Sequence, residues 1–153
     1  MKSSVLGFGA AFLLAAGAAN AQVANGSFEL PLVTVGSFTE FAVGSSGIPG
    51  WNVIGPSRTA VAIVSTTFAQ NGVTFQAQSG AQWLDLTGSG SNSSEGVSQA
   101  VSTIAGHRYG LTFYVGNTTG GDIFGTTSTV NVAVNGVQSF TAVNSLVNPT
   151  SLS

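Results

Sequence analysis

Few residues of this 153-residue chain could carry out catalytic or metal chemistry. It has one histidine, no cysteine and five acidic residues, which are Glu29, Glu40, Asp85, Glu95 and Asp122. Their spacing sets no two carboxylates opposite each other as glycoside hydrolysis requires, and no cluster of histidines and carboxylates indicates a catalytic metal. His107 follows Gly106 in a predicted turn, and Arg108 follows it directly. We therefore predict that the protein is not an enzyme and that His107 is an exposed turn residue.

Carbohydrate binding needs other residues, namely flat aromatic faces for sugar rings and polar neighbours for hydroxyl groups. In "QWLDLT", Trp83 shares a strand face with Asp85, opposite two leucines. In "YGLTFYV", Tyr114 lies opposite Leu111 and Phe113. Trp83, Asp85 and Tyr114 are therefore the candidate ligand-binding residues, and we expect any glycan affinity to be weak, independent of charge and lost on Trp83→Ala. The alternative is that both strand faces are covered, as we expect for Trp51, which we assign to the core.

The first 21 residues form a predicted signal peptide. Lys2 gives a basic start, "VLGFGAAFLLAAGAA" is an uncharged apolar run, and "ANA" at 19–21 places small residues before a cleavage site. The run is shorter than the roughly 20 apolar residues of a membrane-spanning helix. We expect a secreted protein, extracellular, periplasmic or at the cell surface, with no transmembrane segment after cleavage.

The remaining residues, 22–153, are the length of one domain. Only 5% of the chain is charged, against a usual ~25%, while 43% is hydrophobic. After the leader, the basic residues are Arg58 and Arg108. A cationic surface for nucleic acid is therefore not expected.

The pattern of the mature chain predicts an all-β, antiparallel sandwich. Valine, threonine, phenylalanine and tyrosine alternate with polar residues over short runs that glycine-rich and serine-rich loops separate. The expected strands are 59–65 (covered on both faces), 82–87, 97–103, 109–115, 129–134 and 137–143. Asn135-Gly136 between the last two runs is a strong hairpin signal. We expect these side chains to be mostly buried: Phe28, Leu84, Leu86, Leu111, Phe113, Val130, Val132 and Phe140.

Four motifs in order add a resemblance. They are "NGSFELP", "GIPGWNV", "GAQWLDLTG" and "GVSQAVSTIAGHRYGLTFYVGN". Over residues 23–143 the chain resembles a family of secreted domains with the galactose-binding-domain-like jelly roll. Its members occur in plant cell-wall proteins of unknown function and in bacterial exported proteins of the choice-of-anchor and PEP-CTERM types. More distantly, it is similar to carbohydrate-binding modules of the xylanase and cellulase type. The resemblance implies a jelly roll whose last strands are missing from this chain.

The same resemblance suggests a role for Glu29 in "NGSFE". In related jelly rolls the first strand lies beside the last, and calcium often joins the two through carboxylate and backbone oxygens. A single glutamate cannot complete a calcium shell, and the aspartate of the last strand is absent here. No cofactor is therefore required, although a structural calcium at Glu29 is expected for a longer form with an otherwise open first strand. The alternative is a polar contact of Glu29 with the first turn, near Asn25 and Ser27.

Two functions follow from these observations. The first is a non-catalytic extracellular module that binds polysaccharide or cell-surface glycan. The second is a structural or adhesive domain of a surface matrix, without a small ligand. Exposure of Trp83 and Tyr114 would favour the first.

Overall fold

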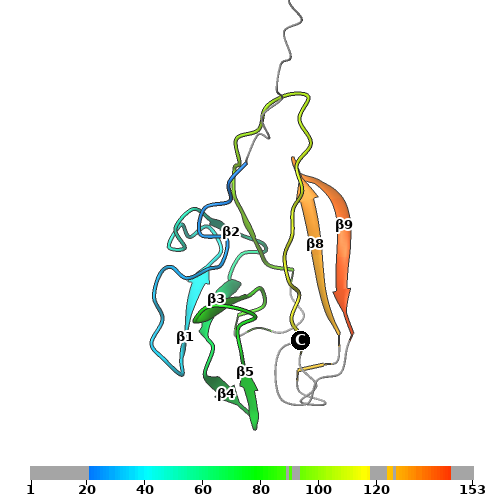
Figure 1. Ribbon diagram of the computed structural model, residues 1–153. Coiled ribbons are helices and arrows are strands. Elements are labelled where there is room, and N and C mark those ends of the chain that lie inside the picture. Colours follow the sequence, from blue (N-terminus) through cyan, green and yellow to red (C-terminus); the bar gives the residue numbers. More distant parts are fainter. Residues whose placement is uncertain (1–20, 89, 91–93, 118–123, 126, 146–153) are drawn as a thin grey trace, which may run out of the picture.

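The computed structural model describes residues 21–88, 90, 94–117, 124–125 and 127–145 (Figure 1). Residues 1–20, which make up all but the last residue of the predicted signal peptide, lie outside the described part. The described strands are β1 (Phe38–Ala42), β2 (Asn52–Ile54), β3 (Ala60–Ser65), β4 (Phe68–Gln70), β5 (Val73–Phe75), β6 (Gln82–Asp85), β7 (Gly96–Ser98), β8 (Ser128–Val134) and β9 (Val137–Asn144). Every pair is antiparallel. β1, β3 and β6 form a sheet in the order β1-β3-β6, and β2-β7, β4-β5 and β8-β9 form two-stranded sheets.

No helix occurs in these described ranges, so the predicted all-β, antiparallel class is confirmed. Closure of the strands into a jelly roll stays a prediction, because the four sheets are separate. Within the described part of the chain, no helix is long and apolar enough to cross a membrane.

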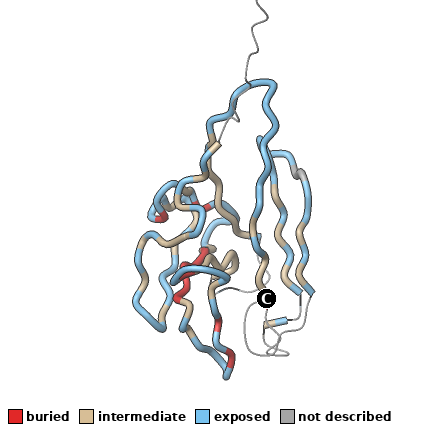
Figure 2. The backbone as a smooth tube through the Cα atoms, viewed as in Figure 1, coloured by how far each residue is buried: buried red, intermediate tan, exposed pale blue. Residues whose placement is uncertain are grey.

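Strand β3 forms the centre of the fold because both of its faces are covered. Its residues are small or β-branched, which suits a strand without a solvent face, and Val61 and Ile63 have no exposed area. They form the main core with Ile48 and Val53. The buried residues cluster around this strand (Figure 2). The prediction of a strand covered on both faces is therefore confirmed.

Partly buried side chains complete this core, among them Phe28, Trp51, Leu84 and Leu86. Phe28 and Trp51 stack with their ring centroids 5.2 Å apart. The Trp51 indole donates a hydrogen bond to the carbonyl of Asn25, 3.1 Å away. These four residues thus occupy the core positions that the sequence predicted.

The opposite face of the sheet carries an aromatic cluster of Phe38, Phe68, Phe75, Trp83 and Phe124. Phe75 is at its centre, with ring centroids 5.9 Å from Phe68, 5.9 Å from Trp83 and 5.1 Å from Phe124. Phe68 also meets Phe38 edge to face. The β4-β5 hairpin supplies two of these rings and so covers part of the sheet.

The β8-β9 hairpin lies to one side of β1–β7 (Figure 1). Asn135 and Gly136 turn the chain with φ of 53° and 77°, the positive values that a two-residue turn between twisted strands requires. The predicted hairpin is therefore confirmed. Val130 and Val132 on its inner face are half-buried. Phe140 on the same face stacks on Phe113 with centroids 5.9 Å apart.

Five predictions about strands and burial are wrong. Residues 109–115 form no strand, Leu111 is 57% exposed and Phe140 is 42% exposed. The expected strand 97–103 is limited to Gly96–Ser98. The "NGSFE" segment forms a turn rather than a first strand, with the amide of Phe28 bonded to the carbonyl of Asn25. Alternation shows that a segment suits a sheet, but a strand also needs a neighbour in register, which these segments lack.

Candidate functional site: a groove and its side pocket

A broad groove of about 2640 Å³ lies between the β1–β7 part and the β8-β9 hairpin. Phe75 and Trp83 line it from the first part, Val130 and Val132 line it from β8, and Tyr114 lines it from the segment that precedes the hairpin. The predicted ligand-binding residues Trp83, Asp85 and Tyr114 all line this groove. The fold therefore brings them to one surface, although they come from separate elements.

Trp83 and Asp85 lie on the same face of β6, as predicted. Trp83 pairs with Val64 and Asp85 with Ala62 of the neighbouring strand β3, so one residue separates them in each strand. The indole of Trp83 is half-buried and stacks on Phe75, which packs against one side of it. Its Nε1 is buried and has no hydrogen-bond partner.

The carboxylate of Asp85 is held by the chain that follows it. Its Oδ1 accepts hydrogen bonds from the amide and the hydroxyl of Thr87, each 2.8 Å long. Burial raises the pKa of Asp85 above its ordinary value of 3.8, and the Glu40 charge raises it further, while the Thr87 and Gly88 hydrogen bonds act against the rise. Asp85 is therefore a positioned acceptor whose charge is disfavoured by its surroundings.

Tyr114 differs from Trp83 in its exposure. Its side chain is 71% exposed, on an extended segment that forms no strand. The same segment exposes Leu111 and Tyr109, by 57% and 38%. Tyr114 thus offers an uncovered aromatic ring beside the groove, as a sugar platform requires.

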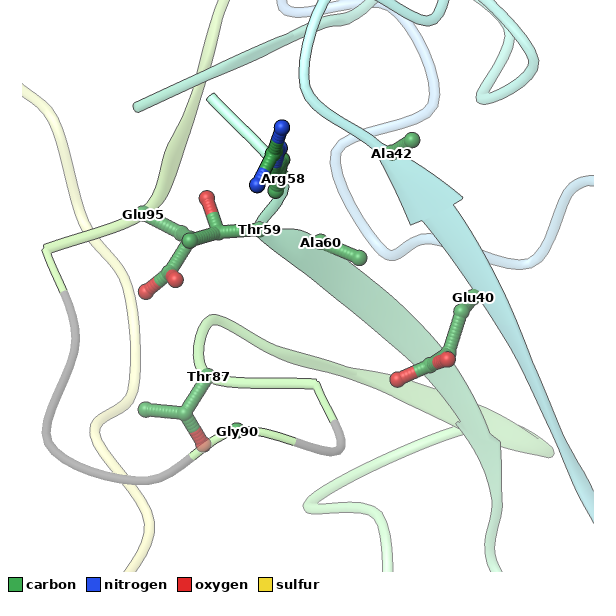
Figure 3. Close-up of a pocket in the computed structure, with 8 residues that line it drawn as sticks. All are labelled: Glu40, Ala42, Arg58, Thr59, Ala60, Thr87, Gly90 and Glu95. Atoms are coloured by element: carbon green, nitrogen blue, oxygen red, sulfur yellow. The ribbon is translucent and has the colours of Figure 1, made fainter. Parts of the chain in front are cut away.

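A smaller pocket of about 390 Å³ adjoins the groove (Figure 3). Its lining residues are Glu40, Ala42, Arg58, Thr59, Ala60, Thr87, Gly90 and Glu95. Thr87, Gly90 and Glu95 also line the groove, so the two spaces are adjacent. In Figure 3, Glu95 and Glu40 stand on opposite sides of the pocket, with Arg58 drawn above it and Thr87 below it.

Strand pairing explains why these residues meet. In the antiparallel sheet, β1 ends where β3 begins, since Ala42 pairs with Ala60, and β6 ends beside the same position. Glu40 comes from β1, and Thr87 follows β6 at that end. Pairing of Ile54 with Gly96 then places Glu95 next to the loop that carries Arg58.

Two glycines allow the backbone to pack closely against the pocket residues. A Cβ on Gly88 would lie 2.5 Å from the carbonyl oxygen of Ala60 and 3.2 Å from Oε1 of Glu40. A Cβ on Gly55 would lie 3.0 Å from Cα of Glu95. Oε2 of Glu95 is buried there without a hydrogen-bond partner.

Sequence reasoning missed this pocket. Glu40, Arg58 and Glu95 are far apart in the chain, and no motif spacing links them. The informative signal was the buried strand 59–65, but its partners on either side were not determined by pattern. Asp122, the fifth acidic residue, lies outside the described residues.

Glu29 lies elsewhere and holds a loop. Its carboxylate accepts hydrogen bonds from the amides of Ala81, at 3.0 and 3.3 Å, and of Gln82, at 3.3 Å. The carboxylate also packs against Gly80, where any side chain would collide with it. Its partners are therefore in this loop and not at Asn25 or Ser27, which corrects the partners proposed from the sequence.

This geometry bears on the expected calcium ion. The groups facing the Glu29 carboxylate are N–H donors, whose positive ends suit an anion and repel a cation. The described residues contain no group of three or more His, Cys, Asp or Glu side chains that could hold a metal ion. In this chain the Glu29 carboxylate therefore makes polar contacts with backbone amides, and a structural calcium in a longer form stays a prediction.

His107 is exposed in a turn, as predicted, with its amide 3.2 Å from the carbonyl of Ile104.

The comparison with protein families decides the classification. A family model described as "Protein of unknown function (DUF642)" matches residues 21–150. The chain belongs to the DUF642 family. This confirms the resemblance to galactose-binding-domain-like proteins that the four motifs indicated. No curated protein and no solved structure matches this DUF642 chain significantly.

Proposed function

We propose that this DUF642 domain is a non-catalytic extracellular module that binds polysaccharide or cell-surface glycan along the groove. One observation carries the proposal. Among the described residues, two buried side-chain polar atoms lack a hydrogen-bond partner, Trp83 Nε1 and Glu95 Oε2, and both residues line the groove.

Unpartnered buried polar atoms are rare because each costs about 1–3 kcal/mol. One of these two atoms is a donor and the other is an acceptor. A ligand rich in hydroxyl groups, which donate and accept, satisfies both atoms if the Trp83 and Glu95 side chains shift on binding to expose them.

The size and lining of the groove support a polymer. Pockets for small ligands have volumes of about 300–1,000 Å³, whereas the groove measures about 2640 Å³. It combines aromatic rings, such as Tyr114 and Phe113, with neutral polar side chains, such as Asn131 and Thr129. Sugar rings pair with such a surface through their C–H faces and their hydroxyls.

The test is retention on insoluble polysaccharides, with cellulose, xylan and galactan as probes. Tyr114→Ala removes the exposed ring, and we expect retention to fall while the unfolding temperature stays unchanged. Trp83→Phe removes the Nε1 donor but keeps a ring against Phe75, whereas Trp83→Ala would also remove that packing. Leu32→Ala, which changes an 80% exposed side chain outside the groove, is the control.

Binding that persists from low to high salt is expected, because the proposed ligand is uncharged and its stacking and hydrogen bonds include no ion pair that salt would screen. Loss of retention in salt, or equal retention by Tyr114→Ala and the parent protein, would contradict the role of the groove.

A structural or adhesive domain of a surface matrix is the second candidate. Its supporting observation is the set of apolar side chains that the β8-β9 hairpin exposes: Val134 and Val143 by 58% each, and Val137 by 69%. This function predicts self-association that Val137→Ser weakens in sedimentation, with no dependence on added glycan.

A further inference from the structure

We infer that the side pocket of Figure 3 is a subsite for one terminal or branching sugar, which it recognises through a pair of adjacent hydroxyl groups. This inference rests on the proposed glycan-binding function and assigns the specificity of the site to Arg58 and Glu95.

The volume of the pocket supports one small unit. At about 390 Å³, it lies at the lower end of the range for ligand sites and suits one or two sugar rings. It lies next to the groove, with which it shares Thr87, Gly90 and Glu95 as lining residues. A polymer in the groove can therefore place an end or a branch in the pocket.

The charges in the pocket suit hydroxyl pairs. Arg58 presents N–H donors in a planar fork, and Glu95 presents acceptor oxygens. Of two adjacent sugar hydroxyls, one can accept a hydrogen bond from Arg58 while the other donates to Glu95. Glu95 is only partly buried and lines both the pocket and the groove, so its side chain is open to a ligand hydroxyl in the pocket.

The pocket is built before any ligand arrives. Gly55 and Gly88 allow the surrounding backbone to approach Glu95 and Glu40 closely. Thr59, which lines the pocket next to Arg58, donates from its hydroxyl to the carbonyl of Pro56 at 2.8 Å and so orders the loop. Preformed sites lose less entropy on binding than flexible ones.

The experiment measures binding of the full chain to soluble oligosaccharides of cellulose, xylan and galactan by calorimetry. Each is used with free terminal hydroxyls and with the terminal residue O-methylated. Glu95→Gln keeps side-chain size while it removes the charge, and Arg58→Gln replaces the guanidinium group with a shorter neutral amide. Arg108→Gln makes the same charge change at an exposed position that lines neither space.

We expect Arg58→Gln and Glu95→Gln each to lower the affinity for the free-ended oligosaccharide about tenfold, as for loss of a charge-assisted hydrogen bond. Terminal methylation should lower the affinity of the parent protein by a similar factor, and Arg108→Gln should change nothing. Unfolding temperatures of all three variants check that they are folded.

The outcomes separate the two proposals. A parent protein that binds free-ended and methylated oligosaccharides equally, with Arg58→Gln unchanged, contradicts the subsite and leaves binding in the groove. A parent protein that retains none of the polysaccharides and binds none of the oligosaccharides contradicts the proposed function and the subsite together.

Discussion

Residues 21–99 and residues 100–145 are built from similar amino acids but are packed differently. In the described part of the chain, every buried hydrophobic side chain lies between Ile48 and Phe75, in the first region. The second region exposes eight large hydrophobic residues: Ile104, Tyr109, Leu111, Tyr114, Val134, Val137, Phe140 and Val143. Strand-forming residues thus contribute to stability only where another element covers them.

Side-chain amides add a second difference. Gln82 is 3% exposed, and its Nε2 donates to the carbonyls of Phe28 and Pro31 while its Oε1 accepts from the amide of Val33. The Oε1 of Gln99 accepts from the amide of Ala24, and its Nε2 donates to the carbonyls of Ala24 and Gly50. These bonds tie the irregular N-terminal segment to the sheet without any strand pairing.

The largest expected effect tests whether the core of the first region dominates stability. Ile63→Ala removes a side chain with no exposed area, and we expect it to lower the free energy of unfolding by about 2–5 kcal/mol. Val143→Ala, at a 58% exposed position in the second region, should change it by less than about 0.5 kcal/mol. Urea unfolding followed by tryptophan fluorescence measures both. Equal effects would show that the two regions share one core.

A second comparison concerns the buried amide. Gln82→Ala leaves three backbone groups without their partner, so we expect a loss of about 2–3 kcal/mol and faster amide exchange at Val33. Asn144, in the second region, donates to the carbonyl of Val115 at 2.7 Å, and Asn144→Ala should cost about 1 kcal/mol. Hydrogen exchange with mass spectrometry reports which segment loosens. If amide hydrogen exchange rises throughout the chain in Gln82→Ala, the hydrogen bonds of Gln82 do not act only on the N-terminal segment.

Two glycines with positive φ sharpen the comparison further. Gly136 has φ of 77°, and the space where a Cβ would lie is open. Gly136→Ala should therefore lower the free energy of unfolding by about 1 kcal/mol, the strain of a non-glycine residue in the left-handed region. Gly88 has φ of 54° and would place its Cβ 2.5 Å from the carbonyl oxygen of Ala60. We therefore expect Gly88→Ala to cost about 2 kcal/mol and to disturb the side pocket. Thermal unfolding of both variants checks the order, which would be reversed if the pocket were loosely packed.

The smallest expected effect is electrostatic. Burial raises the pKa of Asp85 in the folded protein above its ordinary 3.8, so the folded state holds its proton more tightly than the unfolded state. Stability from this group is therefore present below pH 3.8 and declines as the pH rises through the folded-state pKa. Asp85→Asn keeps an oxygen acceptor for Thr87, and we expect it to raise stability at neutral pH by about 1 kcal/mol or less.

Unfolding of Asp85→Asn and the parent protein at pH 3 to 7 measures this effect. The difference between them should grow with pH. A difference that shrinks toward neutral pH would mean that the carboxylate is stabilised in the folded state.

Several features could be predicted from residues near one another in sequence. Residues 60–64 are apolar at every position, which favoured a strand covered on both faces. Asn135-Gly136 determines its own hairpin because both residues accept positive φ. Alternation alone placed Trp83 and Asp85 on one strand face, and four ordered motifs were enough to indicate the family.

Only the tertiary structure decided what those faces meet. Phe75 stacks on Trp83, the amides of Ala81 and Gln82 bind Glu29, and the pairing of β1 with β3 brings Glu40 to the side pocket near Arg58. The segment 109–115 has the alternation of a strand but no partner in register. The physical reason is that backbone conformation and side-chain direction are local properties, whereas burial, pairing and charge environment depend on contacts between residues far apart in the chain.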